Sequence, residues 1–110
     1  MNCRPEVIIE GKYFNISQCP DCKRLGIYYK NLLIGFSPDT FKTFSQSFTN
    51  IDFHTMAVSF PDGFKHIIVN SCHYDIQFNF NKTEFEELKK LILQANILLE
   101  AKDILDKNNK

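Results

Sequence analysis

The sequence contains no tryptophan, no internal repeat and no excess of charge of either sign. Thirteen basic residues balance thirteen acidic ones, and no block of like charge is longer than a pair. Because phosphate-backbone binding depends on clustered Lys and Arg, this balance argues against nonspecific nucleic-acid binding. The chain also lacks a glycine-rich phosphate loop, a paired-carboxylate motif and an HExxH segment, which are the signatures of several large enzyme classes.

Long apolar runs are missing as well. No uninterrupted stretch of about 20 apolar residues is available to span a bilayer, and residues 1–10 lack the apolar stretch of a secretory signal. We therefore expect a cytoplasmic protein without a membrane segment. In a reducing compartment, the four cysteines are expected to be thiols or metal ligands before they are disulfides.

What the chain does have is the length of one domain and a large number of aromatic rings. With 110 residues and no linker of low complexity, it predicts a single domain over residues 1–110, with residues 106–110 as a loose tail. Its eleven phenylalanines and four tyrosines mostly recur at strand or helix spacing. This spacing favours core packing over a surface that stacks nucleic-acid bases.

The first half of the chain predicts two hairpins and a short helix. Residues 7–9 and 13–16 form the first pair of strands, and residues 25–29 and 32–36 form the second. Ser37 then supplies a helix N-cap, and the proline after it suits the first helical position. Phenylalanines at i, i+3 and i+7 follow, so the helix is expected to end near residue 49.

The second half predicts three more strands. Residues 51–60 are expected to be a strand that ends at the turn Pro61-Asp62-Gly63, where glycine takes the left-handed position. Residues 64–70 return from this turn. Residues 74–80 alternate strictly between apolar and polar side chains, which predicts a strand with one buried and one wet face.

The chain should end in a long helix over about residues 84–105. Asn81 or Thr83 can cap it, and the spacing from Thr83 to Glu86 is that of a capping box. Beyond residue 97 the apolar sector is wider than one sheet requires. A further contact is therefore expected, either with the short helix or with a second copy in a homodimer.

These elements predict an α+β fold. Short connections favour antiparallel pairing, so we expect one mainly antiparallel sheet of about five to six strands, with one short helix and one long C-terminal helix.

The segment Cys19-Pro20-Asp21-Cys22 is the one constellation that suggests chemistry. Two cysteines three positions apart can direct both sulfurs to one zinc ion, because a tight turn points the thiolates the same way. A closed structural site needs four ligands. The candidates to complete it are Cys3, Cys72 and His73.

Three interpretations of this turn stay open: a structural zinc site, packed structural thiols, and a redox pair. A redox pair needs its first cysteine at a helix N-terminus, whereas residues 23–29 predict a strand. The basic pair Lys23 and Arg24 favours thiolates in either the zinc or the redox case. His54 and His66 have no partner at a recognised catalytic spacing, so we interpret them as solvent-facing or hydrogen-bonded side chains.

Several motifs together resemble a family of small uncharacterised bacterial proteins. They are the Cys19–Cys22 turn before a strand pair, the helix start at Ser37-Pro38, the turn at residues 60–63 and the long C-terminal helix. The resemblance covers roughly residues 16–100. It implies no activity and carries no functional residue to this chain.

The leading functional hypothesis is a non-enzymatic interaction or regulatory module. We expect it to form a homodimer through the C-terminal helix. The cysteine turn would then be a structural zinc site or a packed knuckle. Two alternatives remain. One is a thiol-based redox protein that uses Cys19 and Cys22. The other is a zinc-knuckle nucleic-acid binder with exposed rings that stack on bases.

Overall fold

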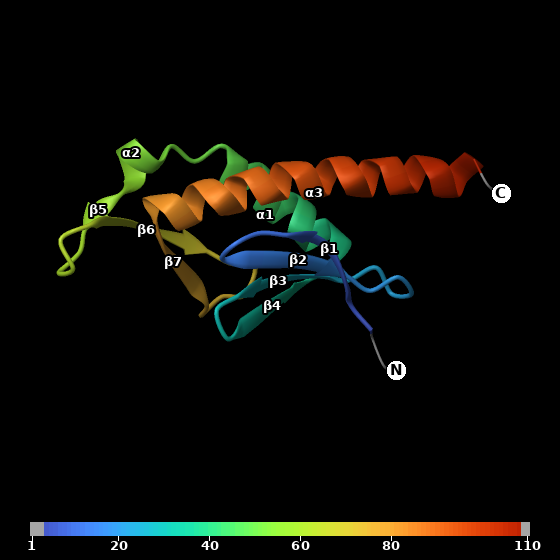
Figure 1. The fold of residues 1–110 in the computed structure, drawn as a ribbon, viewed down its shortest axis with the longest axis horizontal. Helices are drawn as coiled ribbons and strands as arrows, with labels where there is room; N and C mark the ends of the chain where they lie inside the picture. Colours follow the sequence, from blue (N-terminus) through green and yellow to red (C-terminus); the bar gives the residue numbers. More distant parts are fainter. Residues whose placement is uncertain (1–3, 109–110) are drawn as a thin grey trace.

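The computed structural model describes residues 4–108 and contains seven strands and three helices within them (Figure 1). The elements are, in chain order, β1 (Glu6–Glu10), β2 (Phe14–Gln18), β3 (Leu25–Tyr29), β4 (Leu32–Phe36), α1 (Pro38–Thr49), α2 (Phe53–Met56), β5 (Val58–Ser59), β6 (Lys65–Asn70), β7 (Gln77–Asn81) and α3 (Lys82–Asn108). No helix among the described residues is long and apolar enough to cross a membrane.

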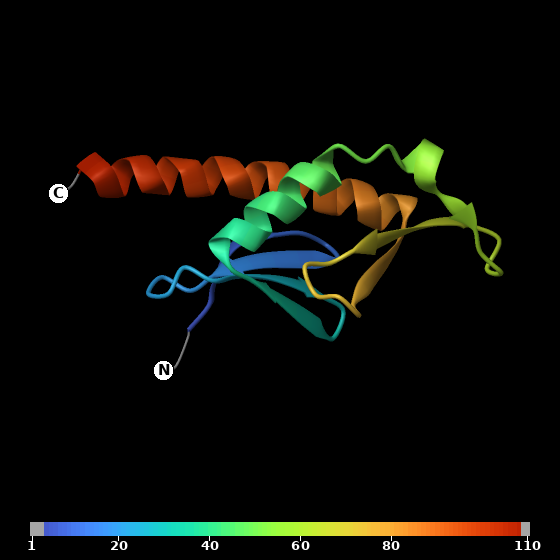
Figure 2. The same cartoon turned by 180° about the vertical axis from the view of Figure 1, so that it is seen from behind.

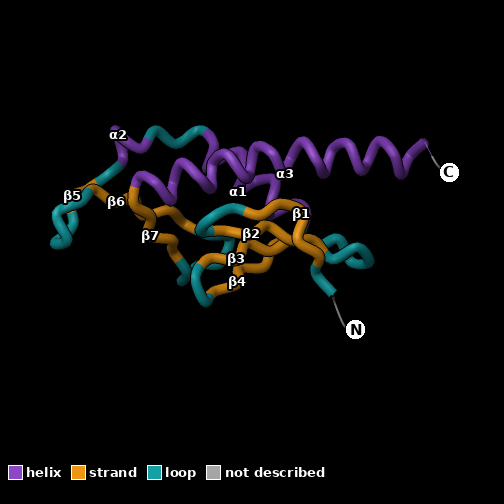
Figure 3. The backbone as a smooth tube through the Cα atoms, viewed as in Figure 1, coloured by secondary structure: helices purple, strands orange, loops and turns teal. Residues whose placement is uncertain are grey.

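The strands form two antiparallel sheets rather than the single sheet expected. The first has the order β1-β2-β3-β4, and the second has the order β5-β6-β7. The tube in Figure 3 shows α3 running along one side of the strands, with β7 leading directly into it. The α+β class is thus confirmed. The number of sheets is the part of the prediction that was wrong.

An aromatic cluster joins the two sheets. The ring of Phe14 in β2 stacks on Tyr29 in β3 with a centroid distance of 4.8 Å. Phe80 in β7 meets both rings edge-on, at 5.4 Å and 5.3 Å. Most of the phenylalanines are buried in the same core, namely Phe14, Phe36, Phe41, Phe44, Phe48, Phe53, Phe78, Phe80 and Phe85. Core packing is therefore confirmed as the main role of these rings.

The first hairpin is tied to α3 near the start of that helix. The carboxylate of Glu87 accepts hydrogen bonds from the backbone N–H groups of Lys12 at 2.8 Å and Tyr13 at 2.7 Å. Gly11 lies so close to the helix that an added Cβ would stand 2.7 Å from the Cδ1 atom of Leu91. Glycine therefore allows the turn to approach these helix side chains closely, and the helix supplies acceptors for two amides that β pairing leaves open.

Helix α1 begins and ends where the sequence predicted. The Ser37 hydroxyl accepts the backbone N–H of Thr40 at 3.1 Å, which satisfies one of the unpaired amides of the first turn. Figure 2 shows α1 crossing α3 obliquely on the side of the molecule hidden in Figure 1. Its buried phenylalanines fill the space between α3 and the sheets.

The predicted strand over residues 51–60 is wrong. Asp52 caps a single helical turn instead, because its carboxylate accepts the backbone N–H of His54 at 3.1 Å and the hydroxyl of Thr55 at 3.0 Å. This turn brings Phe53 into the core, where its ring lies 5.6 Å from that of Phe85. A local side-chain cap therefore overrides the strand propensity, and only β5 remains extended.

The predicted strand over residues 74–80 forms only from Gln77 onward. The residues before it fold into a loop that Ser71 closes, since its hydroxyl donates to the carbonyl oxygen of Ile76 at 2.6 Å. Tyr74 is consequently almost fully exposed. Apolar alternation extended the prediction into a segment where the serine makes a competing local turn.

Helix α3 is capped by Asn81. The Asn81 side-chain oxygen accepts the Glu84 N–H at 2.9 Å, and the Glu84 carboxylate accepts the Asn81 N–H at 3.0 Å. This reciprocal pair is the capping box, so Asn81 is the correct one of the two predicted caps, and the box between Thr83 and Glu86 is wrong. The helix continues to Asn108, so residues 106–108 are helical instead of belonging to a loose tail.

Glu84 also fixes a buried tyrosine. The hydroxyl of Tyr29 donates to the second carboxylate oxygen of Glu84 at 2.8 Å. Burial, followed by the hydrogen bond and the negative charge of Glu84, raises the pKa of Tyr29 well above its ordinary value. The N-terminus of α3 is thereby joined to the centre of the first sheet.

Candidate functional site

The cysteine turn connects β2 to β3 as a loop closed by its own backbone. The N–H of Cys19 donates to the carbonyl oxygen of Arg24 at 2.9 Å, and the N–H of Lys23 donates to the carbonyl oxygen of Cys19 at 2.9 Å. Lys23 has a φ of 66°, in the left-handed region that residues with a side chain rarely adopt. Cys19 is buried, and Cys22 is half-buried. The loop therefore holds its two cysteines in a compact turn.

The register of the first sheet relates this turn to the N-terminal segment. Strand β1 is antiparallel to β2, with Glu6 opposite Gln18. Residues 4 and 5, which precede Glu6, therefore lie toward the end of β2 from which the cysteine turn begins. Cys3, one of the predicted ligands, lies outside the described residues.

Cys72 and His73 occupy a different place, in the loop between β6 and β7. The Cys72 thiol donates to the carbonyl oxygen of Gly35 at 3.5 Å, and Nε2 of His73 lies 3.0 Å from the same oxygen. Gly35 belongs to β4, the far edge of the first sheet from β1. Within residues 4–108, no three His, Cys, Asp or Glu side chains converge as a metal site would require. Neither Cys72 nor His73 is thus brought to Cys19 and Cys22.

The segment after the cysteine turn bears on the redox interpretation. Residues Leu25–Tyr29 form β3, as the sequence predicted, so Cys19 and Cys22 precede a strand. A helix N-terminus at this place would stabilise a thiolate through its dipole. The turn lacks that source of activation.

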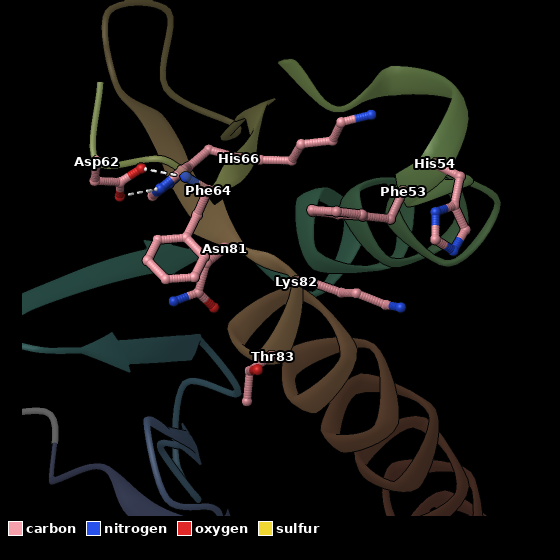
Figure 4. Close-up of a pocket in the computed structure, with 9 residues that line it drawn as sticks. Phe53, His54, Asp62, Phe64, His66, Asn81, Lys82 and Thr83 are labelled. Atoms are coloured by element: carbon pink, nitrogen blue, oxygen red, sulfur yellow. Dashed lines mark hydrogen bonds and ion pairs between the residues drawn. The ribbon is translucent and has the colours of Figure 1, made fainter. Parts of the chain in front are cut away.

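A second candidate site is a pocket of about 390 Å³ between the β5–β6 hairpin, α2 and the start of α3 (Figure 4). Nε2 of His66 lies 2.6 Å from Oδ2 of Asp62, and Nδ1 lies 3.0 Å from Oδ1 of Asn79. The ring also stacks on Phe60 with a centroid distance of 4.3 Å. His66 is therefore held on both ring nitrogens and on one face.

Asp62 is oriented by the turn in which it lies. Its Oδ1 atom accepts the backbone N–H of Phe64 at 2.9 Å. That bond, followed by the hydrogen bond to His66, lowers the pKa of the Asp62 carboxyl below its ordinary value. The Asp62 carboxylate is thus ionised at neutral pH. Through His66, which contacts both Asp62 and Asn79, the β5–β6 turn is linked to β7.

The chemistry available to this pocket is limited. A general base needs a free lone pair within reach of a proton, and both nitrogens of His66 are occupied. His54 lies on α2, across the pocket from His66 in Figure 4. The nine lining residues include no serine or cysteine. The contacts of His66 with Asp62 and Asn79 indicate that this side chain serves to fix the hairpin.

The outer side of α3 carries the third feature. Toward its C-terminus the helix extends beyond the sheets (Figure 1). Its apolar side chains there are well exposed, with exposed fractions of 66% for Ile97, 57% for Ile104 and 63% for Leu105. We call Leu93, Ile97, Leu98, Ala101, Ile104 and Leu105 the outer row.

The profile of a family of unknown function, DUF6686, matches residues 1–109. The chain belongs to this family. No match was found among curated proteins or among solved structures. The expected membership in a small uncharacterised family is therefore confirmed, and DUF6686 brings no activity or functional residue with it.

In this DUF6686 chain, sequence analysis missed the Asp62–His66–Asn79 arrangement. A usable signal was present, because Asp62 lies in the predicted tight turn and His66 follows it by four positions, at the start of the returning strand. The partner on β7 gave no such signal. In the pairing of β6 with β7, His66 lies opposite Asn81. Asn79 is two residues before Asn81 on β7, so its contact with His66 depends on this pairing.

Proposed function

We propose that this DUF6686 chain is a non-enzymatic interaction module that forms a homodimer through the outer row of α3. The observation that supports the proposal is the exposure of this row. A helix that packs only on its own domain presents one apolar stripe to the core and polar side chains elsewhere. Here a second stripe points away from the core.

The two stripes lie on different sides of the same helix. Leu88, Ile92 and Ala95 are fully buried and face the sheets. An α-helix turns about 100° per residue, so Ile97 lies about 200° around the axis from Ala95. Ile97, Ala101 and Ile104 then repeat at i, i+4 and i+7, which is the pattern of a helix–helix seam.

The occupant we favour for this seam is a second copy, packed antiparallel. Ala101, the smallest residue of the outer row, lets the two helices approach closely at the centre of the pair. In an antiparallel register that places Ala101 opposite Ile104 of the partner subunit, Glu100 of each copy lies near Lys107 of the other. Two opposite-charge contacts then flank the seam by symmetry. A parallel pair would place Glu100 beside Leu105, without this complementarity.

The oligomeric state tests the proposal. A pair of single helices buries less than the standard interface of roughly 1,600 Å², so we expect a dissociation constant in the micromolar range, of order 1–100 μM. Sedimentation equilibrium should detect the dimer. Ile104→Lys should weaken it at least about tenfold, because two ammonium groups would enter the seam. Leu33→Lys, at an exposed apolar position of β4, is the matched control and should leave it unchanged.

A charge exchange tests the orientation. Lys107→Glu should weaken the dimer about threefold to tenfold, because two attractions become repulsions. Adding Glu100→Lys should restore the wild-type constant. A monomer at all concentrations would refute the homodimer, whereas a dimer indifferent to both charge variants would refute the antiparallel register.

We further propose that the cysteine turn binds a structural zinc through Cys19 and Cys22, with Cys3 as the third protein ligand. Two observations support this. The backbone closes the turn in a compact loop with Lys23 in the left-handed region, and the pairing of Glu6 with Gln18 places residues 4 and 5 toward the same end of β2. Cys72 and His73 bond to Gly35, so the proposed site has three protein ligands and a solvent molecule in the fourth position, and it is not the closed four-ligand site that the sequence predicted.

Metal analysis of protein purified without a metal-affinity step tests the zinc proposal. We expect one zinc per chain and a fall in Tm of about 10 °C on chelation. Cys22→Ser should abolish metal binding, whereas Cys72→Ser should retain it. Metal-free protein with unchanged stability in chelator would refute the proposal. In that case, the dependence of thiol alkylation on pH would test the redox alternative.

A further inference from the structure

The pocket between α2, the β5–β6 hairpin and the start of α3 is more basic than the chain as a whole. Its nine lining residues include two lysines, two histidines and a single acid, Asp62. The whole chain, in contrast, has equal numbers of basic and acidic residues. A cavity lined mainly by charges of one sign raises the local concentration of ligands of the opposite sign. The pocket therefore favours an anion.

Lys65 and Lys82 bring this positive charge to the side of the pocket next to α2. Lys65 lies on the same face of β6 as Ile67 and Val69, which are buried in the core. Figure 4 shows the side chain of Lys82 pointing toward the side of the pocket on which His54 lies. Within residues 4–108, neither lysine forms an ion pair. Their ammonium groups are therefore free to contact a ligand.

The carboxylates of the surrounding elements offset little of this charge. Asp62 is paired with His66 at 2.6 Å. Asp52 caps the first turn of α2, and Glu84 accepts the hydroxyl of Tyr29 at 2.8 Å. Neither Asp52 nor Glu84 lines the pocket. The two lysines are consequently opposed by one acid of the lining, which is already held by a histidine.

The side of the pocket formed by the hairpin is aromatic. Phe64 is 69% exposed, and in Figure 4 its ring lies on the side away from His54 and Lys82. A planar apolar group placed against this ring would remove apolar surface of both partners from water. The pocket thus combines a cationic side with an aromatic side.

From these features we infer that the pocket binds a small aromatic phosphate monoester, which is a planar ring that carries a phosphate of nearly two negative charges. The phosphate lies between the ammonium groups of Lys65 and Lys82, with the hydroxyl of Thr83 as a further donor. The ring lies against Phe64. The volume of about 390 Å³ is near the lower end of the range usual for ligand pockets, so one ring with its phosphate suits it.

This inference is independent of the dimer and of the zinc site, because the pocket lies at the start of α3, away from the outer row and from the cysteine turn. It is also an inference of binding without catalysis, since both ring nitrogens of His66 are occupied.

Phenyl phosphate is the probe that carries both parts of the ligand. Titration of the full chain in a buffer without inorganic phosphate, followed by two-dimensional NMR, should shift the backbone amide signals of Phe64, Lys65 and Thr83. We expect a dissociation constant of about 0.1–1 mM for so small a ligand. Benzoate has the ring with one charge, phenol has the ring without a charge, and inorganic phosphate has no ring. Each should bind at least about fivefold more weakly.

Lys65→Gln and Lys82→Gln test the position of the phosphate. Each substitution removes one ammonium group, so each should weaken the binding of phenyl phosphate about threefold to tenfold. Lys90→Gln, at an exposed position farther along α3, is the matched control and should leave the dissociation constant unchanged. All three variants should keep the wild-type Tm within about 2 °C, because the positions are on the surface.

Three results would overturn the inference. The first is the absence of any shift at these amides up to about 10 mM phenyl phosphate. The second is equal binding of any of the three control compounds. The third is wild-type affinity for phenyl phosphate in both Lys65→Gln and Lys82→Gln.

Discussion

In the first half of α3, residues 82–95, every apolar side chain except Leu93 lies in the core, whereas residues 96–107 leave most of theirs exposed. The two halves have similar apolar content and belong to one continuous helix. The first half lies against both sheets and α1, whereas the second extends past the sheets toward the C-terminus, with Leu99 alone of its apolar side chains packed against the core (Figure 1). Burial along this helix is therefore decided by what lies beside it.

The first half is also tied by polar contacts that the second half lacks among its described residues. Asn81 and Glu84 cap it, Tyr29 donates to Glu84, and Glu87 accepts two amides from the β1–β2 turn. These contacts fix the position of α3 relative to the first sheet. The second half of α3 is therefore not needed to anchor the helix, and its apolar side chains are available to contact a second copy of the chain.

The sharpest test of the comparison removes one apolar side chain from each half. Leu88→Ala should lower the free energy of unfolding by about 2–5 kcal/mol, because it leaves a cavity in the centre of the core. Ile104→Ala should change it by less than about 0.5 kcal/mol at concentrations where the chain is monomeric. Urea unfolding measures both. Similar losses in the two variants would mean that the halves do not differ.

Glu87→Ala removes the hydrogen bonds between α3 and the β1–β2 turn. Two backbone amides of the β1–β2 turn would lose a charged acceptor, so we expect a loss of about 1–3 kcal/mol in urea unfolding. Glu86→Ala, at the exposed neighbouring position, is the matched control and should cost little. Equal effects of the two variants would assign the loss to helix charge instead of to this contact.

The smallest expected effect concerns the pH dependence conferred by Tyr29. Because its pKa is raised in the folded state, the hydroxyl stays protonated there while the unfolded chain releases its proton near pH 10.0. The contribution of Tyr29 to the free energy of unfolding is therefore fully present below about pH 10, and it decreases as the pH rises above that value. Tyr29→Phe should remove this component and cost about 1 kcal/mol at neutral pH.

Thermal unfolding between about pH 8 and pH 11 measures this dependence. Tyr28→Phe, on the exposed face of β3, should keep the wild-type profile. If Tyr29→Phe and the wild type lose stability in parallel, the hydroxyl is not responsible for the alkaline decline.

Elements with strong local signals were predicted well. The N-cap at Ser37, the proline after it and the spacing of three phenylalanines delimited α1 correctly. Strands β3 and β4 also matched their predicted ranges, because the tight turn at Lys30 and Asn31 fixes their register.

Elements with competing local signals were predicted poorly. Residues 51–60 contain strand-forming side chains, yet Asp52 accepts two hydrogen bonds and starts a helical turn. Ser71 closes a loop in the same way before β7. In both places one short polar side chain decided the backbone path, and hydrophobic periodicity carries no information about such bonds.

The candidate sites divide along the same line. The spacing of Cys19 and Cys22 was visible in the sequence, but the separation of Cys72 and His73 from them depends on strand order.

The sequence by itself determined the α+β class, the ends of α1 and the apolar stripes along α3, since each depends on residues close to one another in the chain. Only the tertiary structure decided that the strands form two sheets, that His66 is held by Asp62 and Asn79, and that α3 extends past its own core. These features arise from contacts between residues distant in sequence. Such contacts are selected by the packing of the whole chain and leave no local periodicity.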